Sequence, residues 1–311
     1  MSQTTQHILM IRPVSFRMNE QTAVNNYYQK VLDQLTPETV NQKAQAEFDA
    51  FVAQLRKVGV HVVVVQDTLE PDTPDSLFPN NWVSFHANGD AVLYPMFAPN
   101  RRLERREDIF DILEEEGFQL SEIMDYTTAE ADAIFLEGTG SMVLDRVNAK
   151  AYCALSPRAD EDLFMEFCED YEFTPIVFNA FQTVDGQRKP IYHTNVMMCV
   201  GDTFAVICAD CIDDKKERKM VLDSLHGDDK DLILITEDQV NCFAGNMLEV
   251  LGADERRYLV MSDSAYKALT KKQIEQLEEH VTILHANLDT IEACGGGSAR
   301  CMMAEIFLPI Q

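Results

Sequence analysis

A thiol, an imidazole and a carboxylate stand out in this sequence as a set of groups that together can break a C–N bond. Cys301 follows the glycine run Gly295–Gly297, whose backbone amides can approach a ligand closely, and the adjacent Arg300 favours the thiolate form. His193 lies in a strand-like stretch and is a candidate proton carrier for such a nucleophile. Glu137 follows an apolar run, where a charge needs partners. It could orient His193, accept hydrogen bonds from substrate nitrogens, or do both.

These three residues belong to a longer series of polar residues that recurs along the chain. Asn81, Glu137, His193, Asn246 and Cys301 are separated by 56, 56, 53 and 55 residues, and we expect each to open the first strand of a hairpin. A period near 55 residues in units of the ββαβ type predicts a radial array of about five units. Equivalent positions in such an array face one axis. The thiol, the imidazole and the carboxylate should therefore share one pocket.

The elements that must position these residues follow the same period. Period-2 alternation and turn signals predict the hairpins Trp82–Phe85 with Ala91–Pro95, Ser141–Leu144 with Ala151–Leu155, Val196–Val200 with Thr203–Ala209, Met247–Leu251 with Arg257–Met261, and Cys301–Phe307 with the N-terminal His7–Val14. Helical spacing predicts helices at Lys43–Val58, Arg102–Glu116, Ala159–Tyr171, Asp213–His226 and Thr270–Glu279. Short strands should follow at Val60–Val65, Gln119–Ile123, Thr174–Val177, Leu232–Ile235 and Val281–Leu284. We expect one α/β catalytic domain over residues 1–311.

Composition and charge exclude several classes of partner. The formal net charge of −26 repels phosphate backbones and anionic lipid surfaces, so neither nucleic acid nor a membrane is expected as a partner. No run of about 18 apolar residues is present, and the N-terminal residues 1–6 lack the basic start of a secretory signal. We expect a cytoplasmic protein that acts on a small molecule. The acidic surface is compatible with a monomer or a homodimer.

The cysteine and histidine pattern predicts no metal site. The eight cysteines are best explained as reduced thiols of a cytoplasmic protein. Cys208 and Cys211 form one C-x-x-C pair without a second pair, and His280 and His285 span a predicted helix-to-strand turn. The chemistry expected of Cys301 and His193 requires neither a metal nor an organic cofactor.

Three motifs in order resemble the amidinotransferase and guanidino-modifying superfamily, which includes arginine deiminase, agmatine deiminase, dimethylarginine dimethylaminohydrolase and glycine amidinotransferase. The motifs are Leu136–Thr139, His193–Asn195 and Gly295–Cys301, and the resemblance runs from about residue 7 to the end. Two further stretches, Phe78–Trp82 and Asn100–Arg106, resemble the bacterial citrulline utilization hydrolase subgroup. The resemblance implies a five-bladed α/β-propeller (the pentein fold).

The same resemblance implies roles for individual residues. Cys301 would form a covalent adduct with the substrate, and His193 would protonate the departing nitrogen and then activate water. Arg158 resembles an arginine that holds the carboxylate of an amino acid substrate. Arg101 and Arg102 resemble a second such element, with Arg102 favoured over Arg101.

Two departures from the family pattern concern the substrate. Asn81 and Asn195 stand where members that process guanidines usually have aspartates. A neutral amide can donate to a carbonyl oxygen, whereas two carboxylates neutralise a guanidinium cation. The two asparagines therefore favour a ureido group, as in citrulline, whose hydrolysis gives ornithine, ammonia and carbon dioxide. Arginine, agmatine and methylated arginines remain alternative substrates, and amidino transfer or non-catalytic binding of an amino acid remain alternative activities.

Overall fold

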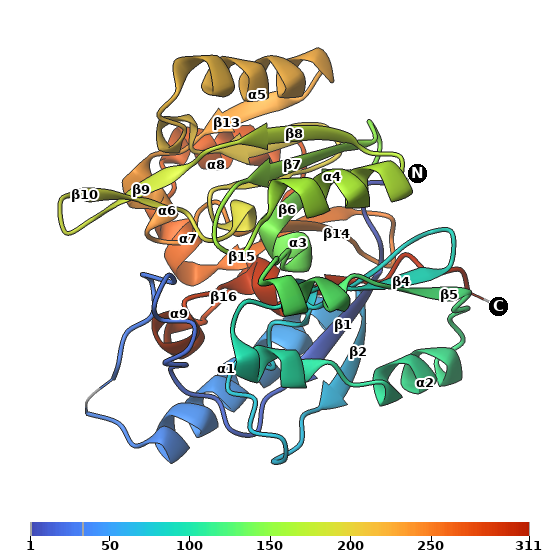
Figure 1. Cartoon of the computed structure of the whole chain (residues 1–311). Helices are drawn as coiled ribbons and strands as arrows, with labels where there is room; N and C mark the ends of the chain where they lie inside the picture. The colour runs from blue at the N-terminus through green and yellow to red at the C-terminus, as the bar shows by residue number, and fades with distance from the viewer. Residues whose placement is uncertain (1, 33, 311) are drawn as a thin grey trace.

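Short three-stranded sheets recur along the chain in the computed structural model, which describes residues 2–32 and 34–310 (Figure 1). Residues 1, 33 and 311 of the predicted 1–311 unit lie outside the described residues. In each sheet the middle strand pairs antiparallel with one neighbour and parallel with the other. Four sheets are consecutive in sequence: β3 (Val83–Phe85), β4 (Asp90–Leu93) and β5 (Glu122–Asp125); β6 (Met142–Asp145), β7 (Lys150–Ala154) and β8 (Thr174–Phe178); β11 (Met198–Val200), β12 (Phe204–Ile207) and β13 (Asp231–Leu234); β14 (Leu248–Leu251), β15 (Arg257–Ser262) and β16 (Thr282–Ala286).

The fifth sheet joins the two ends of the chain, as the sequence predicts. β1 (His7–Arg12) pairs antiparallel with β17 (Ala304–Glu305) and parallel with β2 (His61–Gln66). Ile8 lies opposite Glu305, and Leu9 lies opposite Ala304. The N-terminal strand thus supplies the missing partner of the C-terminal strand, and both termini emerge on the same side of the molecule (Figure 1).

Helices connect the parallel strands. The connecting helices are α1 (Pro37–Lys57), α2 (Asp108–Glu115), α4 (Glu161–Asp170), α5 (Lys215–Gly227), α7 (Asp263–Ala268) and α8 (Lys271–Glu278). The predicted helix Arg102–Glu116 is wrong in its first part, which is a separate 3-10 helix, η2 (Pro99–Glu104). The helical path breaks at Arg105, whose backbone is extended and whose guanidinium pairs with Glu130 at 2.5 Å.

The longest helix shows why these segments fold as they do. The side chain of Thr36 accepts a hydrogen bond from the backbone N–H of Thr39, and Pro37 occupies the first turn, where its missing N–H costs nothing. Arg56 and Lys57 lie in the last turn, beside the negative end of the helix dipole. The buried residues recur at helical spacing and form one apolar face: Val40, Ala44, Phe48, Phe51, Val52 and Leu55.

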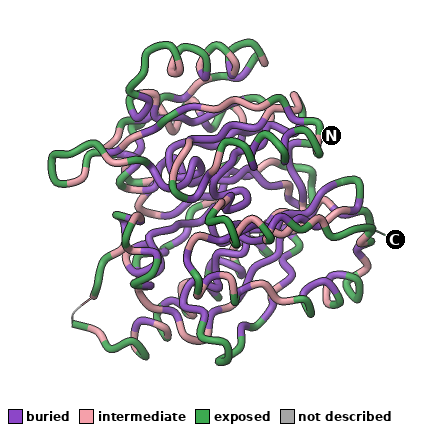
Figure 2. Tube along the Cα trace, viewed as in Figure 1, coloured by how far each residue is buried: buried purple, intermediate pink, exposed green. Residues whose placement is uncertain are grey.

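The remaining elements are short, and the sequence does not predict them. One hairpin, β9 (Phe181–Val184) with β10 (Gln187–Pro190), projects from the body of the molecule and is largely exposed (Figures 1 and 2). Short helical turns precede the first strands of several sheets. The short helices are α3 (Gly138–Ser141), α6 (Glu237–Val240), α9 (Asp289–Gly295), η1 (Pro79–Asn81), η3 (Thr127–Asp132), η4 (Thr194–Val196), η5 (Ala209–Cys211) and η6 (Ala299–Met302).

Buried residues lie in the interior of the trace, and exposed residues form much of its periphery (Figure 2). Phe164 and Phe167 of α4, for example, pack in one cluster with Ala151 and Cys153 of β7. Within residues 2–32 and 34–310, no helix combines the length and the apolar character needed to cross a bilayer.

Candidate active site

Short turns at the starts of the sheets bring the predicted thiol and imidazole to one small cavity. Cys301 and His193 both line this cavity, which has a volume of about 250 Å³. Glu137 lies directly behind His193, because its Oε2 is 2.8 Å from the imidazole Nε2. The predicted convergence of the three groups is therefore present in the structure.

The predicted position of these residues within the repeat needs a correction. None of the five polar residues opens a strand. Glu137 and His193 cap α3 and η4, Asn81 and Cys301 lie within η1 and η6, and Asn246 lies in the loop before β14. The spacing of these residues does not show whether each lies in a strand or in the turn before it. A helix of one turn is too short to produce a recognisable apolar periodicity.

Glu137 is held as an anion. It is fully buried, and its Oε2 accepts hydrogen bonds from His193 and from Arg158 Nη1, the latter at 3.3 Å. Its Oε1 accepts from the backbone N–H of Phe97 at 2.9 Å. Burial alone would raise the pKa of Glu137, but Arg158, His193 and Arg101 outweigh burial and lower it well below its usual range. The anion can therefore orient His193 and stabilise an imidazolium when one forms.

The resting thiol and imidazole are both neutral. Burial lowers the pKa of His193 to about 4, although the hydrogen bond and the charge of Glu137 act in the opposite direction. Burial also raises the pKa of Cys301, which is 2% exposed. A neutral imidazole can accept the proton of the thiol and later return a proton to a leaving group.

Arg158 lies in the same cavity, although its donors are already engaged. Its Nε and Nη2 both donate to Asn25 Oδ1, at 2.9 and 2.5 Å, and Nη2 also donates to the backbone oxygen of Thr22 at 3.0 Å. Its guanidinium carbon lies 4.9 Å from the centre of the Tyr192 ring. With Nη1 donating to Glu137, all three guanidinium nitrogens of Arg158 are engaged within the protein.

The resemblance favours Arg102 over Arg101 as a residue of the site, but the structure places Arg101 nearer the cavity. Arg101 lines the cavity, is 2% exposed, and holds Glu104 through two parallel hydrogen bonds of 2.9 Å. Arg102 does not line the cavity. Its Nε donates to the backbone oxygen of Met96 at 3.0 Å and lies 3.5 Å from Glu130. Successive side chains of a 3-10 helix point about 120° apart, so only one of the two can face the site.

The amide of Asn81 has a fixed orientation. Arg101 Nη1 donates to Asn81 Oδ1 at 2.7 Å, and a guanidinium can only donate, so the oxygen must face Arg101. Asn81 Nδ2 donates to Asn80 Oδ1 at 3.1 Å, which leaves its second N–H without a partner among the described residues. Asn81 lines the cavity and offers it a donor. Asn195 does not line the cavity; its Oδ1 lies 3.9 Å from the sulfur of Cys301.

Asp75 also lies at the cavity, and no motif in the sequence indicates it. It lines the cavity, and its Oδ2 accepts hydrogen bonds from Asn19 at 2.8 Å and from Thr22 at 3.2 Å. Its buried Oδ1 has no partner among the described residues. The available signal is its place three residues before Phe78–Trp82. An unpaired buried carboxylate oxygen favours a cationic group in the cavity.

Residues 19–30, here called the covering segment, close the cavity. Asn26 Nδ2 donates to the backbone oxygens of Gly295 and Gly296 at 3.3 Å, and the backbone N–H of Lys30 donates to Ala293 at 2.6 Å. Gly296 has φ 62°, and a methyl group there would lie 2.5 Å from the Asn26 side chain. The glycine run therefore serves the fit of the covering segment.

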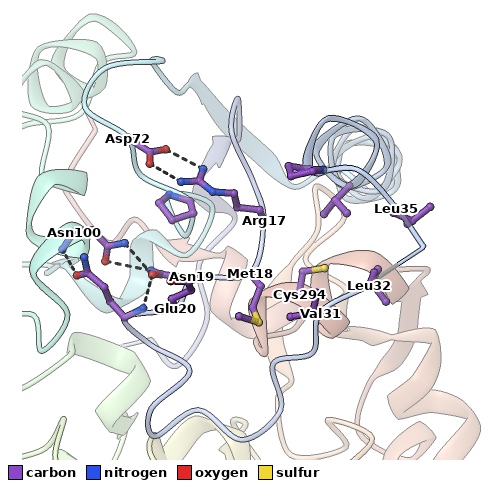
Figure 3. Close-up of a pocket in the computed structure, with 14 residues that line it drawn as sticks. Arg17, Met18, Asn19, Glu20, Val31, Leu32, Leu35, Asp72, Asn100 and Cys294 are labelled. Carbon is purple, nitrogen blue, oxygen red and sulfur yellow. Dashed lines mark hydrogen bonds and ion pairs between the residues drawn. The ribbon is translucent and has the colours of Figure 1, made fainter.

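A wider cleft of about 1180 Å³ is also lined by this part of the chain (Figure 3). Arg17 pairs with Asp72 there, and Asn19 is hydrogen-bonded to Asn100. The cleft contains Cys294 but no imidazole. The set of groups able to do acid–base and nucleophilic chemistry lies in the smaller cavity. Among residues 2–32 and 34–310, no cluster of three or more metal-ligating side chains is suitably placed for a metal ion.

Comparisons with known proteins bear on the family and the fold. The model of the family "N,N dimethylarginine dimethylhydrolase, eukaryotic" matches residues 12–308. A search of curated protein sequences found no match.

Solved structures share the fold. The arginine dihydrolase ArgZ from the ornithine-ammonia cycle in cyanobacteria has a TM-score of 0.74 at 16% identity, over 98% of this chain and 41% of its own. This chain thus spans about two fifths of full-length ArgZ. The substrate-bound N-terminal domain of ArgZ has a TM-score of 0.70 at 17% identity, over 98% of this chain and 99% of that domain. A dimethylarginine dimethylaminohydrolase in an adduct with S-methyl-L-thiocitrulline has a TM-score of 0.62 at 13% identity, over 97% of this chain and 100% of its own.

Proposed function

The chain belongs to the eukaryotic N,N dimethylarginine dimethylhydrolase family of C–N hydrolases, and from that premise we propose that it hydrolyses the ureido group of citrulline to ornithine, ammonia and carbon dioxide. The observation that carries the choice of substrate is the fixed amide of Asn81. Its oxygen is committed to Arg101, so the group that it offers the cavity is an N–H donor. A donor suits the carbonyl oxygen of a ureido group and is repelled by the N–H groups of a guanidinium.

The rest of the cavity suits an α-amino acid. The unpaired Oδ1 of Asp75 provides an acceptor for an ammonium group. Arg158 provides a planar guanidinium for a carboxylate, in exchange for its contacts with Asn25 and Thr22. Asp75 and Arg158, which both line the cavity, match the ammonium and carboxylate groups of an amino acid, and the neutral thiol, imidazole and amide match an uncharged ureido group.

The proposed reaction proceeds in two halves. His193 takes the proton of Cys301, and the sulfur attacks the ureido carbon. The bond from that carbon to the terminal nitrogen breaks, and the nitrogen leaves as ammonia with the proton that His193 carries. The product is an S-carbamoyl link between Cys301 and the side-chain nitrogen of ornithine.

In the second half, His193 removes a proton from water, and the resulting hydroxide attacks the S-carbamoyl carbon. The carbon–sulfur bond breaks, Cys301 regains its proton, and the released carbamate of ornithine decomposes to ornithine and carbon dioxide. Glu137 stays ionised throughout. Its contact of 2.8 Å with His193 stabilises the imidazolium that forms in each half.

A guanidino substrate is the second candidate, because the family model is named for dimethylarginine and ArgZ is an arginine dihydrolase. Glu137 is a poor partner for a substrate guanidinium here, since both of its oxygens already accept hydrogen bonds from Phe97, His193 and Arg158. Arg101 also places a positive charge beside Asn81. Both features support the ureido substrate.

The test offers the purified protein citrulline, arginine, agmatine and dimethylarginine in parallel and measures ornithine, citrulline and ammonia. We expect ornithine and ammonia from citrulline, and none from the Cys301→Ser variant. Asn81→Asp is a matched specificity variant, because it keeps the contact with Arg101 but removes the donor. It should lower kcat/KM for citrulline by about tenfold, the effect of losing one good hydrogen bond in the transition state. Faster turnover of arginine or dimethylarginine than of citrulline by the unmodified protein would refute the assignment, and a new guanidino product with added glycine would identify an amidinotransferase.

We further propose that the five three-stranded sheets are the blades of one α/β-propeller, which forms a single catalytic domain over residues 1–311. The repeated strand order and the contacts of β17 with β3 and of β11 with both β6 and β14 support this arrangement. A cytoplasmic location fits the eight free thiols, none of which is paired in a disulfide.

A further inference from the structure

Asn246 is one of the five recurring polar residues, and the proposed mechanism gives it no role. It is fully buried in the loop before β14. Its Nδ2 lies 3.2 Å from the sulfur of Cys301 and 3.0 Å from the backbone oxygen of Asn195. This nitrogen is closer to the sulfur than Asn195 Oδ1, which lies at 3.9 Å.

The orientation of the Asn246 amide follows from its partners. The backbone N–H of Arg300 lies 3.1 Å from Asn246 Oδ1, and a backbone N–H can only donate. The oxygen of the amide must therefore face Arg300, and the NH₂ group must face the sulfur and Asn195, whose backbone oxygen and Oδ1 lie 3.0 and 3.3 Å from the nitrogen. Arg300 lies one residue before the nucleophile, so the same turn of η6 fixes both the sulfur and the donor that points at it.

Among the described residues, Asn246 is the residue whose side-chain N–H group lies within hydrogen-bond distance of the sulfur. Burial raises the pKa of Cys301. The charged and titratable groups that face it across the cavity are Asp75, Arg101, Arg158, Tyr192 and His193. On its own turn, the guanidinium of Arg300 is turned away and held by Glu305 at 2.7 Å and by the backbone oxygen of Met303 at 2.8 Å.

We propose that Asn246 is a catalytic residue that stabilises the Cys301 thiolate by donating an N–H hydrogen bond to the sulfur. The hydrogen bond from Asn246 to the sulfur becomes stronger as the proton of Cys301 moves to His193, because a hydrogen bond to a charged acceptor is roughly twice as strong as one to a neutral acceptor. The inference rests on Cys301 as the nucleophile and is independent of whether the substrate carries a ureido or a guanidino group.

The experiment measures the thiolate itself. Ultraviolet absorbance of the thiolate is followed against pH, and the signal of the Cys301→Ser protein is subtracted to remove the other cysteines. The variants are Asn246→Leu, which has a similar size and no charge but lacks the donor, and Asn246→Ala, which removes the whole amide. We expect the titration midpoint of Cys301 to rise by about one pH unit or more in both variants, which is a tenfold smaller thiolate fraction at a given pH.

A purely structural role for Asn246 predicts a different result. It would lower stability and activity while leaving the midpoint of Cys301 within about 0.3 units of its original value, a shift smaller than the loss of any hydrogen bond to an anion. That outcome would overturn the proposal. Alkylation of Cys242 by iodoacetamide, read by peptide mass, is the internal control, because this partly exposed thiol lies in the same loop. Its unchanged rate shows that the loop is intact. Because no substrate is present, a failure here is distinct from a failure of the citrulline assignment.

Discussion

The buried imidazole of His193 makes the protein sensitive to mild acid, and the size of this effect follows from the structure. The unfolded chain binds a proton at this residue once the pH falls through 6.5, whereas in the folded protein burial lowers the pKa of His193 to about 4. Between these values only the unfolded state gains the proton, so the free energy of unfolding must fall as the pH falls. A pH of about 5 lies about 1.5 units below the pKa of the unfolded state. At about 1.4 kcal/mol per unit, the free energy of unfolding is therefore lower by about 2 kcal/mol. Glu137 adds a loss of the same sign only below 4.5, because its pKa is also lowered on folding.

The assay compares urea unfolding of the original protein and of His193→Gln at about pH 7.5 and about pH 5, followed by the fluorescence of the buried Trp82. Glutamine keeps a donor for Glu137 and does not titrate, and every other titrating group is common to the two proteins. Between these two pH values, the free energy of unfolding of the original protein should fall by about 2 kcal/mol more than that of the variant. Parallel losses in the two proteins would show that the imidazole is not held neutral, and the account of a neutral base for Cys301 would be wrong.

Two further substitutions test the packing of the site. Gly140→Ala places a methyl carbon 2.8 Å from the imidazole of His193, so kcat should fall by at least about tenfold. Gly227→Ala is the control, because its methyl group meets nothing within 4 Å and should leave kcat unchanged. Equal kcat values for the two variants would contradict the proposed arrangement of the site. Asn25→Ala removes the shared acceptor of Arg158 Nε and Nη2, so the covering segment should open more often and iodoacetamide should alkylate Cys301 several times faster; an unchanged rate would show that this contact does not keep the site closed.

The sequence is most informative where local pattern and tertiary environment agree. The hairpins are predictable because short apolar stretches flank turn residues, as in β11 and β12, where every residue is buried. The pairing of β1 with β17 is predictable for a different reason. The last unit ends with an unpaired strand, and the N-terminal strand is the remaining partner of the right length.

Side-chain direction is where the sequence gives too little information. Arg101 and Arg102 are identical in type and adjacent, and only the orientation of the 3-10 helix η2 decides which faces the cavity. The same holds for Asn81 and Asn195. Both align with the family motifs, yet Asn195 is not in the cavity wall, and its Oδ1 lies 3.9 Å from the sulfur of Cys301.

The covering segment has no periodic signal at all. Residues 13–36 separate β1 from α1 and contain no helix or strand among the described residues. Their length is the only signal, because loops longer than about 15 residues in a compact domain are usually functional. The contacts of Thr22, Asn25 and Asn26 with Arg158 and the glycine run depend on residues that are more than 130 positions away, and no local pattern predicts such contacts.

The most direct test of the account is the mass of the protein during turnover. A reaction with citrulline is quenched in acid within the first turnovers, and peptides are analysed for a modification. We predict an adduct on the peptide that contains Cys301, with the added mass of citrulline less one ammonia, and its absence in Cys301→Ser. Ornithine formation that persists in Cys301→Ser, or an adduct on a different cysteine, would contradict the assignment of this residue as the nucleophile.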